Sequence, residues 1–185
     1  MAGSVDEKVL IARARAGDRA AFDHLVREHF PRVYAVAFRL VGNHEDAEDL
    51  AQECMVRGYL SLRWYRGSGA FSSWLYRIVV HLAHDRHRSA ERNHPMAGYP
   101  EEPVVERGPV HELGRKELNL ALLDSIRKLP DSLRTALVLR TLEGMDYAAI
   151  ADATGFTATT IRTQVMKARR ALLRLMQPYF QGSTR

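Results

Sequence analysis

The sequence predicts an all-α protein in which a flexible linker joins two small helical domains. Apolar residues recur at three- and four-residue steps along most of the chain, and no window shows the sustained two-residue alternation of a half-buried strand. Between residues 89 and 113 this pattern gives way to proline, glycine and glutamate, a composition typical of linkers. With 185 residues and 46% apolar composition, the chain can build two small cores.

The first predicted domain, residues 1–90, reads as a series of amphipathic helices. Its longest stripe contains Phe22, Leu25, Val26, Phe30, Val33, Ala37 and Leu40. The next segment repeats the pattern with Ala47, Leu50, Ala51 and Cys54. Glycines at 17 and 42 predict the breaks between helices, and Pro31 predicts a kink or a boundary.

The second predicted domain, residues 116–185, follows a linker placed at residues 91–115. From Leu129 the spacing predicts a helix, then a short helix from about Tyr147, a turn at Gly155 and a longer helix after Thr157, which can cap it. This order is that of a helix-turn-helix. The outward residues near the start of the last helix are Thr159, Thr160, Arg162, Thr163, Met166 and Lys167.

Charge is unevenly distributed along the chain. The totals are 27 Lys and Arg against 22 Asp and Glu, but no acid occurs from Cys54 to His84 or after Asp152. Segregated basic zones suit a polyanion such as nucleic acid, although solvated helix faces produce the same pattern. Five acids are in turn gathered in "EDAEDLAQE", residues 45–53.

Aromatic residues accompany the first basic zone. The stretch "WYRGSGAFSSWLYRIVVHLAHDRHR", residues 64–88, places a Gly-Ser-Gly turn between Tyr65 and Phe71 and continues as a helix with Trp74 and Arg77. Rings and arginines around a flexible turn suit single-stranded bases. Aromatics at helical spacing are also typical of a core, and for Trp74 we favour packing.

Other classes of site receive less support. No apolar run approaches the roughly 18 residues of a membrane span, and acids near the N-terminus are unlike a secretory signal, so we expect a cytoplasmic protein without membrane insertion. The single cysteine, Cys54, is expected to be buried and to serve in core packing. His81, His84 and Asp85 in "HLAHDRH" leave open an all-helical metal-dependent phosphohydrolase. We nevertheless predict no metal, no cofactor and no enzymatic activity.

Four fragments in order, "ARAGDRAAFDHL", "DAEDLAQE", "YRGSGAFSSWLYRI" and "LEGMDYAAIADATGFTATTIRTQV", resemble a known family. They are similar to bacterial sigma factors of the extracytoplasmic-function (ECF) class within the sigma-70 family, the compact type with only regions 2 and 4. The resemblance implies that region 2 binds the clamp helices of the polymerase beta-prime subunit and melts the minus-ten element. It implies that region 4 reads the minus-thirty-five element, and that the chain directs transcription initiation while core RNA polymerase performs the chemistry.

The resemblance also assigns residues to these tasks. The expected contacts with core polymerase are Asp46, Asp49, Gln52 and Glu53. The expected minus-ten contacts are Tyr65, Arg66, Gly67, Ser68, Gly69, Ala70, Phe71, Trp74, Arg77 and His81. The expected minus-thirty-five contacts are Thr159, Thr160, Arg162, Thr163, Met166 and Lys167. The resemblance therefore predicts that both duplex and melted promoter DNA are bound, and a separate anti-sigma factor is expected as a further partner.

Two positions depart from the family pattern. His81 stands where the family usually has asparagine, and Gln164 stands where a basic residue is common. The rival in another class is a two-domain transcriptional activator that shares only the helix-turn-helix. Such an activator binds duplex DNA and needs neither the acidic helix nor the aromatic loop.

Overall fold

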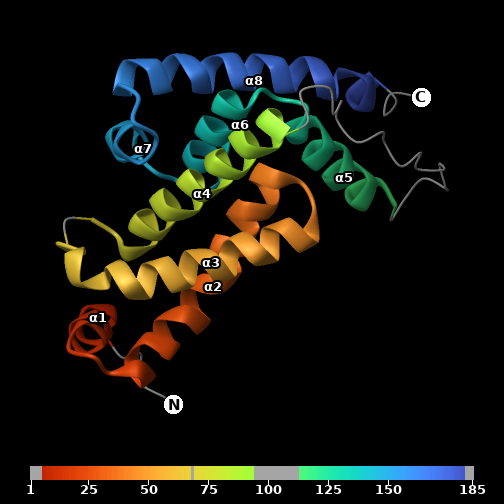
Figure 1. Cartoon of the computed structure of the whole chain (residues 1–185). Helices are drawn as coiled ribbons and strands as arrows, with labels where there is room; N and C mark the ends of the chain where they lie inside the picture. The colour runs from red at the N-terminus through yellow and green to blue at the C-terminus, as the bar shows by residue number, and fades with distance from the viewer. Residues whose placement is uncertain (1–5, 68, 94–112, 182–185) are drawn as a thin grey trace.

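The computed structural model describes residues 6–67, 69–93 and 113–181. Every regular element in these ranges is helical (Figure 1), so the all-α prediction is confirmed. The elements are α1 (Glu7–Arg15), α2 (Arg19–Val41), α3 (His44–Ser61), the short 3-10 turn η1 (Leu62–Trp64), α4 (Phe71–Asn93), α5 (Leu113–Arg127), α6 (Asp131–Leu137), the π-helical turn η2 (Val138–Leu142), α7 (Tyr147–Thr154) and α8 (Ala158–Gln181). No helix in the described part of the chain has the length and hydropathy needed to cross a bilayer.

Helix boundaries in the first half follow local chemistry. The Asp18 carboxylate accepts the Ala21 N–H at 3.1 Å to start α2, and the Asn43 side chain accepts the Asp46 N–H at 2.8 Å to start α3. Gly42 lies between α2 and α3 with φ of 86°, a left-handed conformation that favours glycine. The predicted break there is confirmed, whereas Pro31 ends no helix, because α2 continues through it.

Helix α2 forms the centre of the first half and packs against α1, α3 and α4. Its Val33, Val36 and Ala37 are fully buried. Helix α3 packs on α2, and its small residues Ala47 and Ala51 are also fully buried. The amphipathic stripes read from the sequence therefore form a common core.

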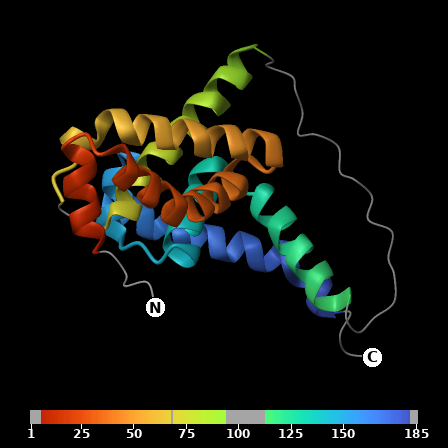
Figure 2. The ribbon, with the colours of Figure 1, turned by 90° about the horizontal axis from the view of Figure 1, so that it is seen from below.

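The second half contains the predicted helix-turn-helix. Helix α7 ends at Thr154 and is followed by Gly155, whose φ is 75°. The Thr157 hydroxyl accepts the Thr160 N–H at 3.1 Å where α8 begins. The predicted turn and cap are both confirmed. Helix α8 packs against α5, α6 and α7, and its C-terminal part runs beside α5, as Figure 2 shows from below.

The two halves pack against each other. Helix α7 lies on α4, and α5 and α6 contact α2, so one continuous cluster of buried apolar residues extends through both halves. The Tyr76 hydroxyl donates to Glu143 Oε2 at 2.6 Å, and His84 Nε2 lies 3.2 Å from the Thr135 hydroxyl. The division at residues 91–115 stays a prediction: α4 and α5 enter that range from either side, and residues 94–112 lie outside the described part.

Arg134 is the most deeply buried cation of this contact. Only 9% exposed, its guanidinium donates to the carbonyl oxygens of Leu40, Arg127 and Leu129. Because a buried charge is costly without hydrogen bonds, these carbonyls stabilise its position. One of them belongs to α2, so Arg134 joins the helix-turn-helix half to the centre of the other half.

Candidate polymerase and promoter interfaces

The acidic residues of α3 lie on the outside of the bundle. Asp49 and Gln52 are exposed, and Asp46 and Glu53 are partly exposed. Arg86 of α4 reaches two of them, with Nη1 2.7 Å from Asp46 Oδ1 and Nη2 3.8 Å from Asp49 Oδ2. The acids at the start of α3 are therefore partly neutralised within the first half.

The next turns of α3 add apolar surface to the acids. Within the described part of the chain, Glu53 pairs with Arg57 of its own helix at 2.7 Å, and Gln52 donates to Glu48 at 3.4 Å. Val56 and Leu60, one and two helical turns after these positions, are 58% and 67% exposed. Sequence reasoning missed these two residues, although their position off the buried stripe was a usable signal. Together Asp49, Gln52, Glu53, Val56 and Leu60 form a mixed acidic and apolar surface, here called the α3 face.

The ends of the loop between η1 and α4 are closed by aromatic packing. Tyr65 is 8% exposed and donates its hydroxyl to the Gly69 carbonyl at 2.7 Å, while Phe71 is fully buried. Trp74 packs on both rings, with centroids 5.2 and 5.3 Å away, and His29 meets Phe71 edge-on at 5.1 Å. Burial raises the pKa of the Tyr65 phenol. Tyr65 and Phe71 belong to the core, and the partly buried Trp74 packs against it, in line with the packing role that the sequence favoured for Trp74.

The exposed part of the loop is small and basic. Arg66, Gly67, Gly69 and Ala70 face solvent, and Ser68 lies outside the described residues. The exposed ring beside the loop is Trp64, which sequence reasoning did not select. It is 69% exposed, and the Arg63 guanidinium lies 4.9 Å from its ring centroid.

Helix α4 carries the remaining predicted minus-ten residues, and α7 covers part of it. Arg77 forms an ion pair with Asp152 of α7. His81, one helical turn further, is exposed. The structure therefore places the predicted minus-ten residues in three settings: solvent for the loop, core for the aromatics, and the contact between the halves for Arg77.

The predicted minus-thirty-five residues lie together on the N-terminal half of α8. Thr159, Arg162, Thr163, Met166 and Lys167 are exposed, and Thr160 is partly buried. The Thr163 hydroxyl donates to the Thr159 carbonyl at 3.1 Å. Beside them is an open polar groove of about 410 Å³, lined by Ser132, Leu133, Thr157, Thr159, Thr160, Thr163, Gln164 and Lys167. This is a basic, hydroxyl-rich helix face of the kind that enters a major groove.

The histidine-rich part of α4 makes protein contacts. His84 approaches Thr135, and His87 Nε2 lies 2.6 Å from Asp131 Oδ2. Burial lowers the pKa of His84. These histidines join α4 to the second half, which accounts for their spacing without a metal.

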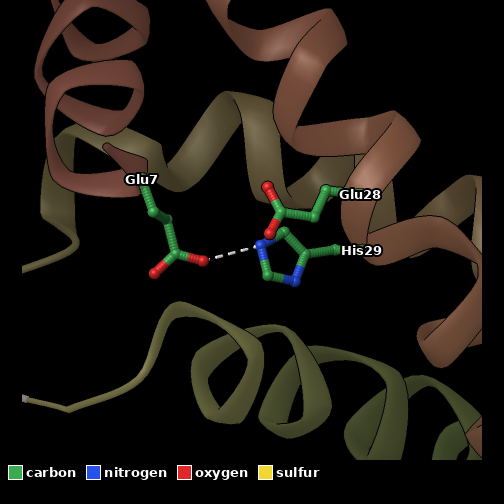
Figure 3. A group of neighbouring side chains, drawn as sticks. All are labelled: Glu7, Glu28 and His29. Atoms are coloured by element: carbon green, nitrogen blue, oxygen red, sulfur yellow. Dashed lines mark hydrogen bonds and ion pairs between the residues drawn. The ribbon is translucent and has the colours of Figure 1, made fainter. Parts of the chain in front are cut away.

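Among the described residues, one group of three side chains could bring metal ligands together: Glu7, Glu28 and His29 (Figure 3). Glu7 Oε1 lies 2.8 Å from His29 Nε2 and joins α1 to α2. Metal-binding histidines usually donate their second ring nitrogen to an acceptor, but the buried His29 Nδ1 has no partner in the described structure. The group fits an interhelix tether better than a metal site.

Cys54 is buried, and its Sγ lies 3.4 Å from the Leu75 carbonyl oxygen. Burial raises the pKa of its thiol to about 12. The predicted packing role is confirmed.

The chain is similar to known proteins along most of its length. Sigma-70 region 2 matches residues 25–93, and Sigma-70, region 4 matches residues 119–172. The sigma-H factor of Pseudomonas aeruginosa is 31% identical over 183 residues, covering 93% of this chain and 94% of that protein. The ECF sigma-E factor of Escherichia coli K12 is 31% identical over 189 residues, covering 96% and 98%.

Two solved structures share the fold. The sigma factor RpoE of Bartonella quintana, in complex with the anti-sigma factor NepR, has a TM-score of 0.70 at 21% identity, covering 84% of this chain and 96% of that one. CnrH, in complex with the cytosolic domain of CnrY, has a TM-score of 0.69 at 22% identity, covering 93% and 97%. The expected resemblance is confirmed: the chain belongs to the sigma-70 family, in its ECF class, and carries regions 2 and 4.

Proposed function

We propose that this chain is a sigma factor that binds core RNA polymerase, directs it to promoters and helps to melt the minus-ten element. The observation that carries the proposal is the match to region 2 and region 4, in order, on a chain that displays two unlike polar surfaces. One is the acidic and apolar α3 face, and the other is the basic N-terminal half of α8. The chain supplies promoter choice and strand opening, and the polymerase supplies the chemistry.

The α3 face is the proposed docking surface for the clamp helices of core polymerase. Asp46 pairs with Arg86 and Glu53 pairs with Arg57, each at 2.7 Å, whereas Asp49 is more exposed and lies 3.8 Å from Arg86. Both Asp49 and Glu53 can turn their carboxylates to a basic partner, because their present pairs lie at the surface. Val56 and Leu60 lie beside them and supply the apolar centre that protein interfaces bury. Charge complementarity then speeds association and selects the partner.

The loop before α4 is the proposed minus-ten site. Its exposed backbone and Arg66 can hold a displaced strand, and the packed Tyr65 and Phe71 give the loop a fixed base. Trp64 adds an exposed ring on which an unpaired base can stack. Arg77 and His81 extend this surface along α4.

The N-terminal half of α8 is the proposed reader of the minus-thirty-five element. An arginine such as Arg162 can donate two hydrogen bonds to guanine, and Met166 and the threonine methyl groups can meet thymine methyls. Lys167 is placed to hold phosphate. Gln164 is uncharged and only partly exposed, so it offers no positive charge to the DNA phosphates.

The proposed place of action is the cytoplasm, where the polymerase and the chromosome lie, and no catalytic group is assigned to the chain. A separate anti-sigma factor is the proposed regulatory partner. This part of the proposal is supported by the two solved relatives, a sigma factor in complex with NepR and CnrH in complex with the cytosolic domain of CnrY.

The test is transcription with purified components. Core RNA polymerase, free of any other sigma factor, is combined with this chain and a randomised promoter library, and the 5′ ends of the transcripts are sequenced. We expect initiation at templates that share two short elements separated by a fixed spacer. Transcription only after a housekeeping sigma factor is added would favour the two-domain activator instead.

A further inference from the structure

Tyr147, the first residue of α7, lies beneath two guanidinium groups. The Cζ atom of Arg140 is 4.6 Å from the Tyr147 ring centroid, and that of Arg162 is 5.3 Å away. Both distances are within the range of a cation–π interaction. One ring therefore connects η2, α7 and the helix α8 that carries the proposed reading surface.

The position of the Tyr147 ring is fixed by neighbouring contacts. Arg140 Nη1 donates to the carbonyl of the buried Met145 at 2.8 Å, so its guanidinium is attached to the turn that leads into α7. On the next residue, the Asp146 carboxylate accepts the Ala149 N–H at 2.7 Å and sets the start of α7. Tyr147 itself is half-buried. Its position is thus determined by the backbone and by Arg140 together.

Arg162 is restrained by this ring and by little else. It is exposed, and within the described structure its guanidinium makes no hydrogen bond or ion pair. A carboxylate partner would occupy the N–H groups that bidentate recognition of guanine needs. A π face instead attracts the cation while leaving those N–H donors available.

We propose that Tyr147 is a positioning residue for Arg162, so that it contributes to base-pair selection in the minus-thirty-five element through the arginine. The inference rests on the proposed function, because it requires that α8 reads duplex DNA. Without the ring, the Arg162 side chain samples more conformations in the free protein. Binding to DNA must then restrict them, and this loss of conformational entropy weakens binding. An exposed cation–π contact corresponds to a change of about two- to fivefold in binding.

The experiment compares holoenzymes made with wild-type chain, Tyr147→Phe and Tyr147→Leu. Binding to a library randomised in the minus-thirty-five element gives both the overall affinity and the preference at each base pair. The base pair read by Arg162 is the one whose preference disappears in Arg162→Ala. We expect Tyr147→Leu to lose about two- to fivefold of discrimination at that base pair alone, while Tyr147→Phe retains it.

A double-mutant cycle separates positioning from a general structural role. In the Arg162→Ala background, Tyr147→Leu should have little further effect on preference, because the residue it positions is absent. Unchanged preference in Tyr147→Leu, or an equal loss at every base pair in both backgrounds, would overturn the inference. If Tyr147→Leu does not fold by circular dichroism, Tyr147→Met replaces it under the same criteria. Failure of wild-type holoenzyme to select any element would instead refute the proposed function, and the inference with it.

Discussion

Glu143 joins the two halves of the molecule, and its removal should measurably destabilise their contact. Its side chain is 12% exposed, accepts the Tyr76 hydroxyl at 2.6 Å and lies 3.9 Å from Arg39 Nη1. Glu143→Ala leaves the hydroxyl of the 3% exposed Tyr76 without its acceptor. That loss should cost about 1–3 kcal/mol, and the long, partly solvated contact with Arg39 should add at most about 1 kcal/mol.

Glu143→Gln separates these contributions, because the amide oxygen can still accept from Tyr76 while the charge is lost. We expect a loss of about 2–3 kcal/mol for Glu143→Ala and of about 1 kcal/mol for Glu143→Gln. The free energy of unfolding is measured in urea by circular dichroism and tryptophan fluorescence, whose transitions must coincide.

A matched control is Asp85→Ala on α4, where the acid is exposed and its ion pair in the described structure is with Arg88 of the same helix. This variant should stay within about 0.5 kcal/mol of wild type. A Glu143→Ala protein as stable as this control would show that the two halves do not make this contact in solution.

Three further predictions concern the proposed interfaces and pH. Glu53→Lys should weaken binding to core polymerase at least tenfold in an affinity assay, with the fold intact. The control Asp23→Lys, which changes an exposed acid of α2, should bind normally. Equal binding by both variants would contradict the role of the α3 face. Trp64→Ala should slow open-complex formation, measured by the permanganate reactivity of unpaired thymines, and Trp64→Phe should restore the rate. A normal rate in Trp64→Ala would exclude stacking on this ring. Burial lowers the pKa of His84 in the folded protein below its ordinary value of about 6.5. The stability that comes from keeping His84 neutral is therefore fully present above pH 6.5 and is lost as pH falls below that value. His84→Gln should therefore flatten the fall in unfolding free energy as pH drops below about 6.5, and an unchanged slope would assign that fall to other groups.

Local chemistry explains what the sequence predicted well. Thr157 and Gly155 act on neighbouring backbone groups, so the start of α8 and the end of α7 could be read from a few residues. Apolar periodicity likewise determined which faces of α2 and α3 are buried. Neither inference required knowledge of distant parts of the chain.

The aromatic loop shows where sequence reasoning was insufficient. A tyrosine and a phenylalanine beside a glycine turn and arginines suit both base stacking and core packing. The outcome depends on His29 and Trp74, which pack against Phe71 in three dimensions. The same uncertainty hid Trp64, whose exposure no periodicity could distinguish from burial.

Contacts between the halves were equally out of reach, because they join distant residues. Tyr76 and Glu143 are 67 positions apart, and His84 and Thr135 are 51 apart. Spacing along one helix carries no information about which side chain of another helix lies opposite. Prediction of these partners requires the packing of one half against the other, which results from the whole apolar cluster.

This packing affects the two proposed surfaces of region 2 differently. The residues of the α3 face are exposed or partly exposed, so the proposed docking of a protein partner there requires no rearrangement of the described helices. Arg77 on α4 is paired with Asp152 of α7, so a DNA phosphate must displace that carboxylate before Arg77 can bind it. The exposed pair itself contributes at most about 1 kcal/mol, whereas separating α7 from α4 also exposes apolar surface at about 25 cal/mol per Å². Exposure of more than about 40 Å² of apolar surface would cost more than loss of the ion pair, so we expect the packing between the halves, and not the charge on Asp152, to limit use of this part of α4.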